Sequence, residues 1–179
     1  MHNNASTTRR EIEHNIIAYS DIVDHMDIIT NYCKSSFSSN EIILILTHYE
    51  PADKIFEILK RNIKFIEMHK ADGSLVIVDS KRAWFNIKNE FVGITIMLRM
   101  LLTRKAKLCK NGIRVVADMG NFFHPLSRIQ DLLRHEEEIS SFEAFPINFY
   151  CSYSIIDLSS VTNEQEQGLI RKHNRFIRS

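Results

Sequence analysis

Short apolar runs alternate along the chain with longer segments in which apolar residues recur at helical spacing. The short runs predict β-strands, and the longer segments predict α-helices. Residues 41–47 have the sequence EIILILT, a nearly continuous apolar run that is typical of a central parallel strand covered on both faces. The runs that predict strands, including a short edge strand at the end of the chain, are residues 14–19, 41–47, 75–78, 113–117, 146–150 and 176–177.

Five amphipathic segments predict the helices between these strands. Ser20 and Asp21 are both placed to cap the first helix, Pro51 lies in the first turn of the second, and Thr162 or Asn163 caps the last. The predicted helices are residues 22 to about 35, 51–62, 91–109, 126–142 and 163–172. Residues 63–73 fit neither pattern, and residues 81–90, which hold the only tryptophan, predict a polar connection. The alternation predicts one three-layer α/β domain with a mainly parallel sheet.

The composition is ordinary for a globular protein, with 179 residues, 44% hydrophobic and 25% charged. A net charge of +1 gives no strong field toward nucleic acid or a membrane, and we expect contact with neither. Residues 1–12 are polar and unpatterned, so we expect a flexible N-terminal segment followed by a single domain over residues 13–179. Three widely spaced cysteines and the lack of a signal-peptide pattern predict a cytoplasmic protein without disulfides.

Polar side chains follow several of the predicted strands. They are Tyr19 and Ser20 at the end of the first strand, His48 to Glu50 after the second, Asp79 after the third, Asp118 at the end of residues 113–117, and Cys151 to Tyr153 after the fifth. Because ligands of open α/β sheets bind beyond the carboxyl ends of the strands, these groups predict a small-molecule pocket there. The alternative is that strand ends are polar because they meet water, and that Asp118 only caps the following turn.

The first strand-to-helix turn, where a phosphate-binding loop would lie, has the sequence YSDIVDHMD. A working phosphate loop needs glycines for close backbone approach and a lysine on the phosphates. This turn has neither, and Asp21 and Asp24 would repel a triphosphate. With no nucleophile motif and no helix-turn-helix pattern either, we expect a protein that is not an enzyme and does not hydrolyse nucleotides.

A set of potential metal ligands is spread along the chain. Two histidines, a cysteine and a glutamate have the chemistry of a metal site, but no two of them have tight ligand spacing. We therefore expect hydrogen-bonded structural histidines and a buried cysteine, with no metal and no cofactor. The four residues are His14, Glu136, Cys151 and His173.

Several short segments, in their order along the chain, resemble the motifs of a known family. They are residues 14–19 (HNIIAY), 112–119 (GIRVVADM), 132–136 (LLRHE), 151–153 (CSY) and 169–177, in which His173 is the histidine of an L-x-x-x-H-x-x-x-I pattern. Together they are similar to the MEDS domain, a sensory domain named for methanogens, methylotrophs and a dichloromethane-responsive regulator, over about residues 11–178. The sequence differs from the family pattern at Ala117, Asp118 and His135, where the family has glycine, glutamate and tyrosine.

The resemblance implies a RecA/KaiC-like α/β fold without a functional phosphate loop and a role in sensing small, hydrocarbon-derived molecules. It also implies signal transduction or transcriptional regulation through an effector protein, which we expect to be supplied in trans. Tyr19, Asp118, Cys151 and Tyr153 would line the pocket, with His14, Glu136 and His173 supporting or completing it. Two alternatives are a degenerate nucleotide-binding protein without hydrolysis and a domain that serves only for homo-oligomer assembly.

Overall fold

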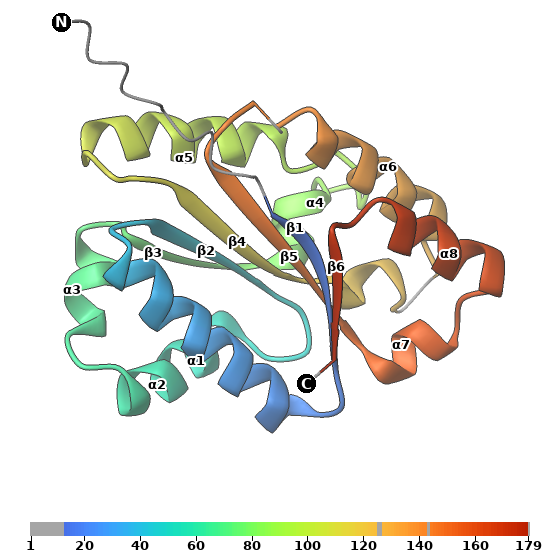
Figure 1. Cartoon of the computed structure of the whole chain (residues 1–179), viewed down its shortest axis with the longest axis horizontal. Coiled ribbons are helices and arrows are strands. Elements are labelled where there is room, and N and C mark those ends of the chain that lie inside the picture. The colour runs from blue at the N-terminus through green and yellow to red at the C-terminus, as the bar shows by residue number, and fades with distance from the viewer. Residues whose placement is uncertain (1–12, 125–126, 143, 179) are drawn as a thin grey trace, which may run out of the picture.

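The computed structural model describes residues 13–124, 127–142 and 144–178, so the predicted flexible segment 1–12 lies outside the described residues. Within these ranges the centre is a six-stranded sheet in the order β3-β2-β4-β5-β1-β6 (Figure 1). Every neighbouring pair of strands is parallel. The strands are β1 (His14–Tyr19), β2 (Ile42–Thr47), β3 (Leu75–Asp79), β4 (Ile113–Asp118), β5 (Ile147–Ser154) and β6 (Arg175–Arg178). The predicted three-layer α/β fold and its parallel sheet are confirmed.

Helices cover both faces of the sheet, as parallel sheets require. One apolar core lies between the sheet and α1 (Ile22–Ser38), α2 (Ala52–Asn62) and α3 (Ile66–Ala71). A larger core lies on the opposite face, under α4 (Ser80–Trp84), α5 (Thr95–Lys107), α6 (Ile129–Ser140) and α8 (Asn163–Arg171). The 3₁₀ turn η1 (Met119–Phe122) and α7 (Ile155–Ser159) follow β4 and β5 directly, at the carboxyl edge of the sheet.

The predicted caps form in the structure. Asp21 accepts hydrogen bonds from the backbone of Val23 and Asp24 and begins α1. Thr162 begins α8 with a complete capping box: its hydroxyl accepts from the Gln165 backbone, and its own backbone N–H donates to the Gln165 side-chain oxygen. Pro51 is the cap of α2 rather than a residue of its first turn.

Four segments differ from the sequence prediction. Helix α5 begins at Thr95 rather than at residue 91, because Gly93 has a φ of 71° and Phe91 pairs with Phe85 in an isolated β-bridge. The predicted polar connection contains α4, whose Trp84 is fully buried in the larger core. Strand β5 continues to Ser154 instead of ending at residue 150. Helix α6 begins at Ile129, because Ser127 and Arg128 are not helical; the predicted start at Leu126 itself falls outside the described residues.

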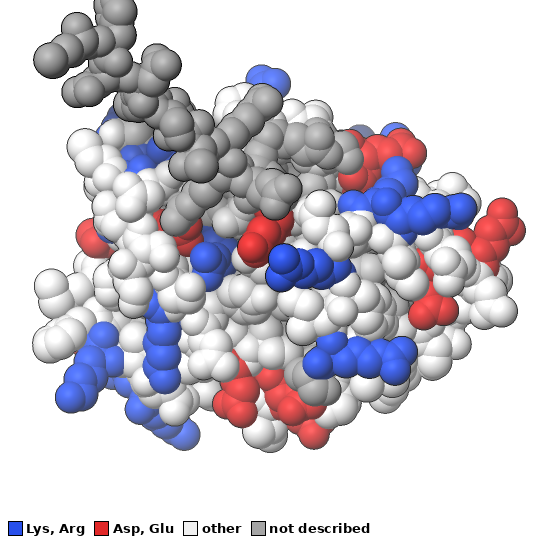
Figure 2. Space-filling view, in the orientation of Figure 1, with Lys and Arg blue, Asp and Glu red and all other residues white. Residues whose placement is uncertain are grey.

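Charged side chains of both signs are interspersed over the face of the molecule in Figure 2, in keeping with the small net charge. Among the helices that the structure describes, none is both long and apolar enough to cross a membrane.

Candidate functional site

A pocket of about 330 Å³ opens at the carboxyl edge of the sheet, beyond the ends of β1 and β5. In parallel α/β sheets this edge is the usual place for a ligand. The described side chains that line it include hydroxyls, an imidazole and two isoleucines, and neither a lysine nor an arginine. They belong to Tyr19, Ser20, Asp21, Ile22, Tyr49, His124, Ser154 and Ile156.

A buried carboxylate organises the wall of this pocket. Asp157, on α7, is 1% exposed. It accepts hydrogen bonds from the Tyr49 hydroxyl at 2.9 and 2.8 Å, and its Oδ1 lies 3.1 Å from Nε2 of His124. Burial raises the pKa of Tyr49, and the hydrogen bond to Asp157 raises it further, so the phenol stays protonated. The arrangement joins the segments that follow β2, β4 and β5, and Tyr49 and His124 line the pocket.

Asp118, the candidate that the sequence singled out, lies behind this wall and caps the turn after β4. Its Oδ1 accepts a hydrogen bond from the Gly120 backbone at 3.0 Å, and the backbone groups of His48 and Tyr49 also bond to it. Burial raises the pKa of this carboxyl to about 7, although the backbone hydrogen bonds oppose the change. A side chain at position 120 would collide with the rings of His48 and Tyr49, so glycine is needed for this close approach.

Tyr19 lies between Asp118 and the first helix. Its ring stacks on His25 with a centroid distance of 4.1 Å, and burial raises the pKa of its hydroxyl, followed by the effect of Asp118. Nε2 of His25 is 2.9 Å from the hydroxyl of Ser152, which donates its own hydrogen to the Ala117 carbonyl. His25 is therefore the donor in that contact, and burial lowers the pKa of its imidazole to about 4.

The amino terminus of α1, where a phosphate loop would present its backbone amides, is occupied by the protein's own carboxylate. Asp21 Oδ1 accepts from the amides of Val23 at 2.8 Å and Asp24 at 3.0 Å. These are the donors that a helix terminus would otherwise offer to an anion. Asp24 in turn accepts hydrogen bonds from the backbone and side chain of Ser20. The local charge is negative, which opposes phosphate binding.

A second group of predicted residues meets on the other side of the sheet, under α6 and α8. Nε2 of His14 lies 3.0 Å from Oε2 of Glu136 and 3.6 Å from Sγ of Cys151. Nε2 of His173 lies 3.4 Å from the same glutamate oxygen, and the Tyr153 hydroxyl donates to Oε1 of Glu136 at 3.0 Å. We call His14, Glu136, Cys151 and His173 the buried cluster; their ligand atoms all lie within 4.8 Å of one another.

The protonation states around this cluster follow from its burial. Burial raises the pKa of Glu136, but the hydrogen bond from His14 and the nearby imidazoles outweigh it, and the pKa falls to about 2. Burial also raises the pKa of Cys151 and Tyr153 well above their ordinary values, with the Glu136 charge adding to the effect. The pKa of His173 is lowered by burial against the opposing effect of Glu136. The carboxylate thus keeps its charge in the interior.

The predicted site residues therefore form two groups rather than one. Tyr19 and Asp118 lie at the carboxyl edge, as expected. The expectation that Cys151 and Tyr153 follow the fifth strand is wrong, because β5 continues through both and holds them on the sheet face. His14 begins β1, at the opposite edge of the sheet, and cannot line the same pocket. Any role of these residues in ligand binding stays a prediction.

Sequence reasoning did not single out His124, Ser154 and Ile156 of the pocket lining, nor Asp157, which contacts Tyr49 and His124 from behind the pocket wall. Asp157 was not singled out because α7 has only five residues and follows its strand without a loop. The available signal was Ser154, whose hydroxyl accepts from the Asp157 backbone three residues later, the pattern of a helix cap. His124 lies after a 3₁₀ turn that carries no periodic pattern.

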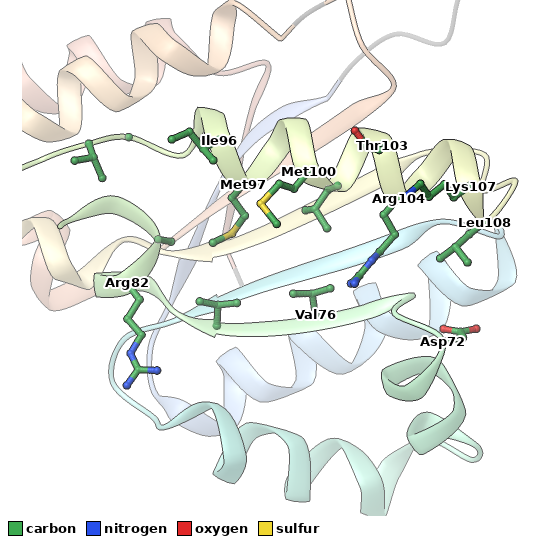
Figure 3. A pocket seen from close by; sticks show the side chains of 15 residues that line it. Asp72, Val76, Arg82, Ile96, Met97, Met100, Thr103, Arg104, Lys107 and Leu108 are labelled. Carbon is green, nitrogen blue, oxygen red and sulfur yellow. The ribbon is translucent and has the colours of Figure 1, made fainter. Parts of the chain in front are cut away.

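A second hollow, a groove of about 710 Å³, lies between α5 and the edge strand β3 (Figure 3). Met97 and Met100 of α5 face Val76 of β3, and Arg82 and Arg104 lie along the sides. The groove is mainly apolar and has no cluster of buried ionisable groups.

Comparisons with known proteins identify the fold and the family. A KaiC-like protein from the hyperthermophilic archaeon Pyrococcus horikoshii OT3 has a similar structure, with a TM-score of 0.53 and 14% sequence identity. The alignment covers 79% of this chain and 61% of that one, and at this identity it shows the fold alone. No curated protein matched the sequence. The family model for the "MEthanogen/methylotroph, DcmR Sensory domain" matches residues 13–174. The chain, a six-stranded α/β protein of the KaiC-like RecA fold, belongs to the MEDS family of sensory domains.

Proposed function

We propose that the protein is a non-enzymatic sensing domain whose carboxyl-edge pocket binds a small, neutral or cationic organic molecule. The observation that carries the proposal is the pocket of about 330 Å³ where Tyr49 and His124 converge on the buried Asp157. A sensing role fits the family, and a concave site with a few convergent polar groups is the usual form of a small-molecule site.

The lining specifies the chemistry of the ligand. The Tyr49 hydroxyl, whose hydrogen is donated to Asp157, can accept a hydrogen bond from the ligand, and the His124 imidazole adds a second polar contact. Ile22 and Ile156 offer apolar contact to a short carbon skeleton. Such a lining suits a small hydrocarbon derivative with a single polar function. The described lining residues carry no lysine or arginine, and Asp21 and Asp157 make an anionic ligand unfavourable.

The same charges argue against the alternative of a degenerate nucleotide-binding protein. A triphosphate at this edge would meet the Asp21 carboxylate on the amides of α1, and the turn holds no lysine to offset its charge. Displacing Asp21 would also cost the cap of the helix, about 0.5–2 kcal/mol. We therefore favour an organic ligand without phosphate groups.

A variant at Tyr49 tests the location of the ligand. Ligand-observed NMR with a fixed panel of one- to four-carbon alcohols, amines and ketones would identify a binding molecule. Replacing Tyr49 with phenylalanine removes one hydroxyl and keeps the ring, so we expect affinity for that molecule to fall by about three- to tenfold, the effect of one hydrogen bond. Tyr32→Phe is the matched control, since Tyr32 packs on Tyr150 away from the pocket.

The α5–β3 groove is the competing location for an apolar ligand, because it is larger and mainly apolar. The same panel is therefore measured on Met100→Glu, a substitution at an exposed position of the groove. Loss of binding in this variant, with unchanged binding in Tyr49→Phe, would move the ligand site to the groove and contradict the proposal.

The proposal includes an output step. A sensing domain must pass its state to an effector, and we propose a protein effector supplied in trans, with the complex acting in the cytoplasm in signal transduction or gene regulation. The family's sensory role supports this step. The segments that form the pocket lead directly into α1, α7 and η1. Ligand binding could therefore shift these elements, which an effector would contact.

A further inference from the structure

The buried cluster brings two imidazoles, a thiol and a carboxylate to one point from four different elements. His14 begins β1, Glu136 lies on α6 and Cys151 on β5, while His173 follows the end of α8. The three ligand-atom distances between neighbours are 3.0, 3.4 and 3.6 Å. A tetrahedral Zn²⁺ site with bonds of about 2.0–2.3 Å has edges of about 3.3–3.8 Å between ligand atoms. The four atoms thus need only small shifts to surround a metal ion.

The orientation of His173 is that of a metal ligand. Its Nδ1 lies 2.7 Å from the Leu169 carbonyl oxygen, so Nδ1 carries the hydrogen and donates it. In the neutral ring this leaves the lone pair of Nε2 directed at the cluster, and Nε2 has no hydrogen-bond partner although the side chain is 1% exposed. Metal-bound histidines are usually held in this way, with the second ring nitrogen donating to a carbonyl or carboxylate.

Two further contacts hold the remaining ligands in place. The Tyr153 hydroxyl donates to Oε1 of Glu136, which leaves Oε2 toward the histidines. The Asn174 side chain accepts from the backbone of His14, and the Asn174 backbone donates to the His14 carbonyl. The start of β1 is thereby tied to the residue next to His173, so the two histidines keep a fixed relation, with ring centroids 3.9 Å apart.

We propose that the buried cluster is a closed, four-ligand site for Zn²⁺. The ligands would be Nε2 of His14, Oε2 of Glu136, Sγ of Cys151 and Nε2 of His173. One thiolate and one carboxylate neutralise a divalent ion, which suits a site whose members are almost wholly buried. Mixed sulfur, nitrogen and oxygen ligands favour zinc over magnesium or calcium. The thiol proton leaves to solvent when the metal binds.

The closed ligand set assigns the metal a structural role. All four positions are filled by the protein, so no position is left for a reacting water, in contrast to a catalytic zinc. The ion would join α6 and the segment before β6 to the strands β1 and β5. This site lies on the opposite face from the Tyr19 side of the sheet, so the inference does not depend on the proposed ligand pocket.

The test is metal analysis of protein purified without a histidine tag, after expression in medium supplemented with ZnSO₄. We expect about one equivalent of zinc per chain by plasma mass spectrometry. After removal of the zinc and addition of CoCl₂, we expect the visible bands of tetrahedral Co²⁺ and a near-ultraviolet thiolate-to-cobalt band. These two measurements use the wild-type chain and need no variant to fold.

Variants assign the signal to the cluster. Cys151→Ser should lose the thiolate-to-cobalt band, and His173→Gln should bind zinc at least about tenfold more weakly. Cys33→Ser is the matched control, because Cys33 is also buried and free but packs against the other face of the sheet. Zinc-free wild-type protein that also gives no thiolate-to-cobalt band would overturn the proposal and leave the cluster a hydrogen-bonded structural group. A thiolate band that disappears in Cys33→Ser and persists in Cys151→Ser would overturn it as well.

Discussion

Asp118 combines a structural contact with an unfavourable charge. Its carboxylate accepts backbone hydrogen bonds at the carboxyl edge, yet it is 2% exposed, and burial raises its pKa to about 7. Folding therefore strengthens proton binding at this group. The resulting contribution to stability is fully present below the ordinary pKa of 3.8 and is lost as the pH rises through about 7.

A substitution isolates this effect. We expect the melting temperature of the wild type, relative to Asp118→Asn, to fall steadily between about pH 4 and about pH 7, because only the wild type acquires a buried charge in that window. The histidines whose pKa is lowered act in the opposite direction, but they are common to both proteins and cancel in the difference. A difference that stays constant over this range would show that the carboxyl does not titrate there.

At the residue scale, the sequence predicted where Tyr19 and Asp118 lie in the fold, but it did not predict what their side chains do. Tyr19 and Asp118 end their strands, and that alone placed them at the carboxyl edge. The sequence left open whether Asp118 lines a pocket or caps a turn, and the structure shows the cap. Tyr49, His124 and Asp157 come from the segments after three different strands. The sequence placed Tyr49 at a strand end, but the approach of His124 and Asp157 to it depends on the complete fold.

At the scale of elements, strands and helices follow the hydrophobic pattern except where a backbone contact overrides it. Apolar residues 91–94 suggest a longer α5, but the positive φ of Gly93 and the Phe85–Phe91 bridge delay its start to Thr95. Strand β5 continues through Ser152, whose hydroxyl is satisfied by the Ala117 carbonyl of the neighbouring strand. The sequence alone does not show that a polar residue such as Ser152 will find a hydrogen-bond partner on the next strand, so the strand was predicted to end before it.

Substitution of Gly93 tests the backbone requirement before α5, and Gly168 on α8 serves as the comparison. Gly93 has a positive φ, and a side chain there would collide with the Glu138 carboxylate, so Gly93→Ala should destabilise the protein by about 1–3 kcal/mol. Gly168 lies on α8 with no atom within 4 Å of the added methyl, and Gly168→Ala should stabilise it by about 0.5–1 kcal/mol. Chemical unfolding of both variants measures the difference. Equal effects of the two substitutions would mean that position 93 has no special backbone requirement.

At the scale of the whole molecule, the fold class was accessible because parallel sheets leave a strong signal of buried strands between amphipathic helices. The strand order β3-β2-β4-β5-β1-β6 was not predicted, because the hydrophobic pattern does not say which strands pair. The buried cluster was not accessible as a unit, because its members are separated by up to 159 positions between His14 and His173. Only the placement of β1 beside β5, and of α6 and α8 over both, brings them together.

The central claim is that the carboxyl edge binds a small organic molecule and has lost nucleotide binding. The most direct measurement is a pair of NMR titrations of isotope-labelled protein, one with Mg²⁺–ATP and one with the panel of alcohols, amines and ketones. We predict that a member of the panel shifts the amide signals of Tyr49, Gly120 and Ser154, and that Mg²⁺–ATP shifts none of them and is not hydrolysed. Shifts at these amides with Mg²⁺–ATP, or no shift with any member of the panel, would contradict the account.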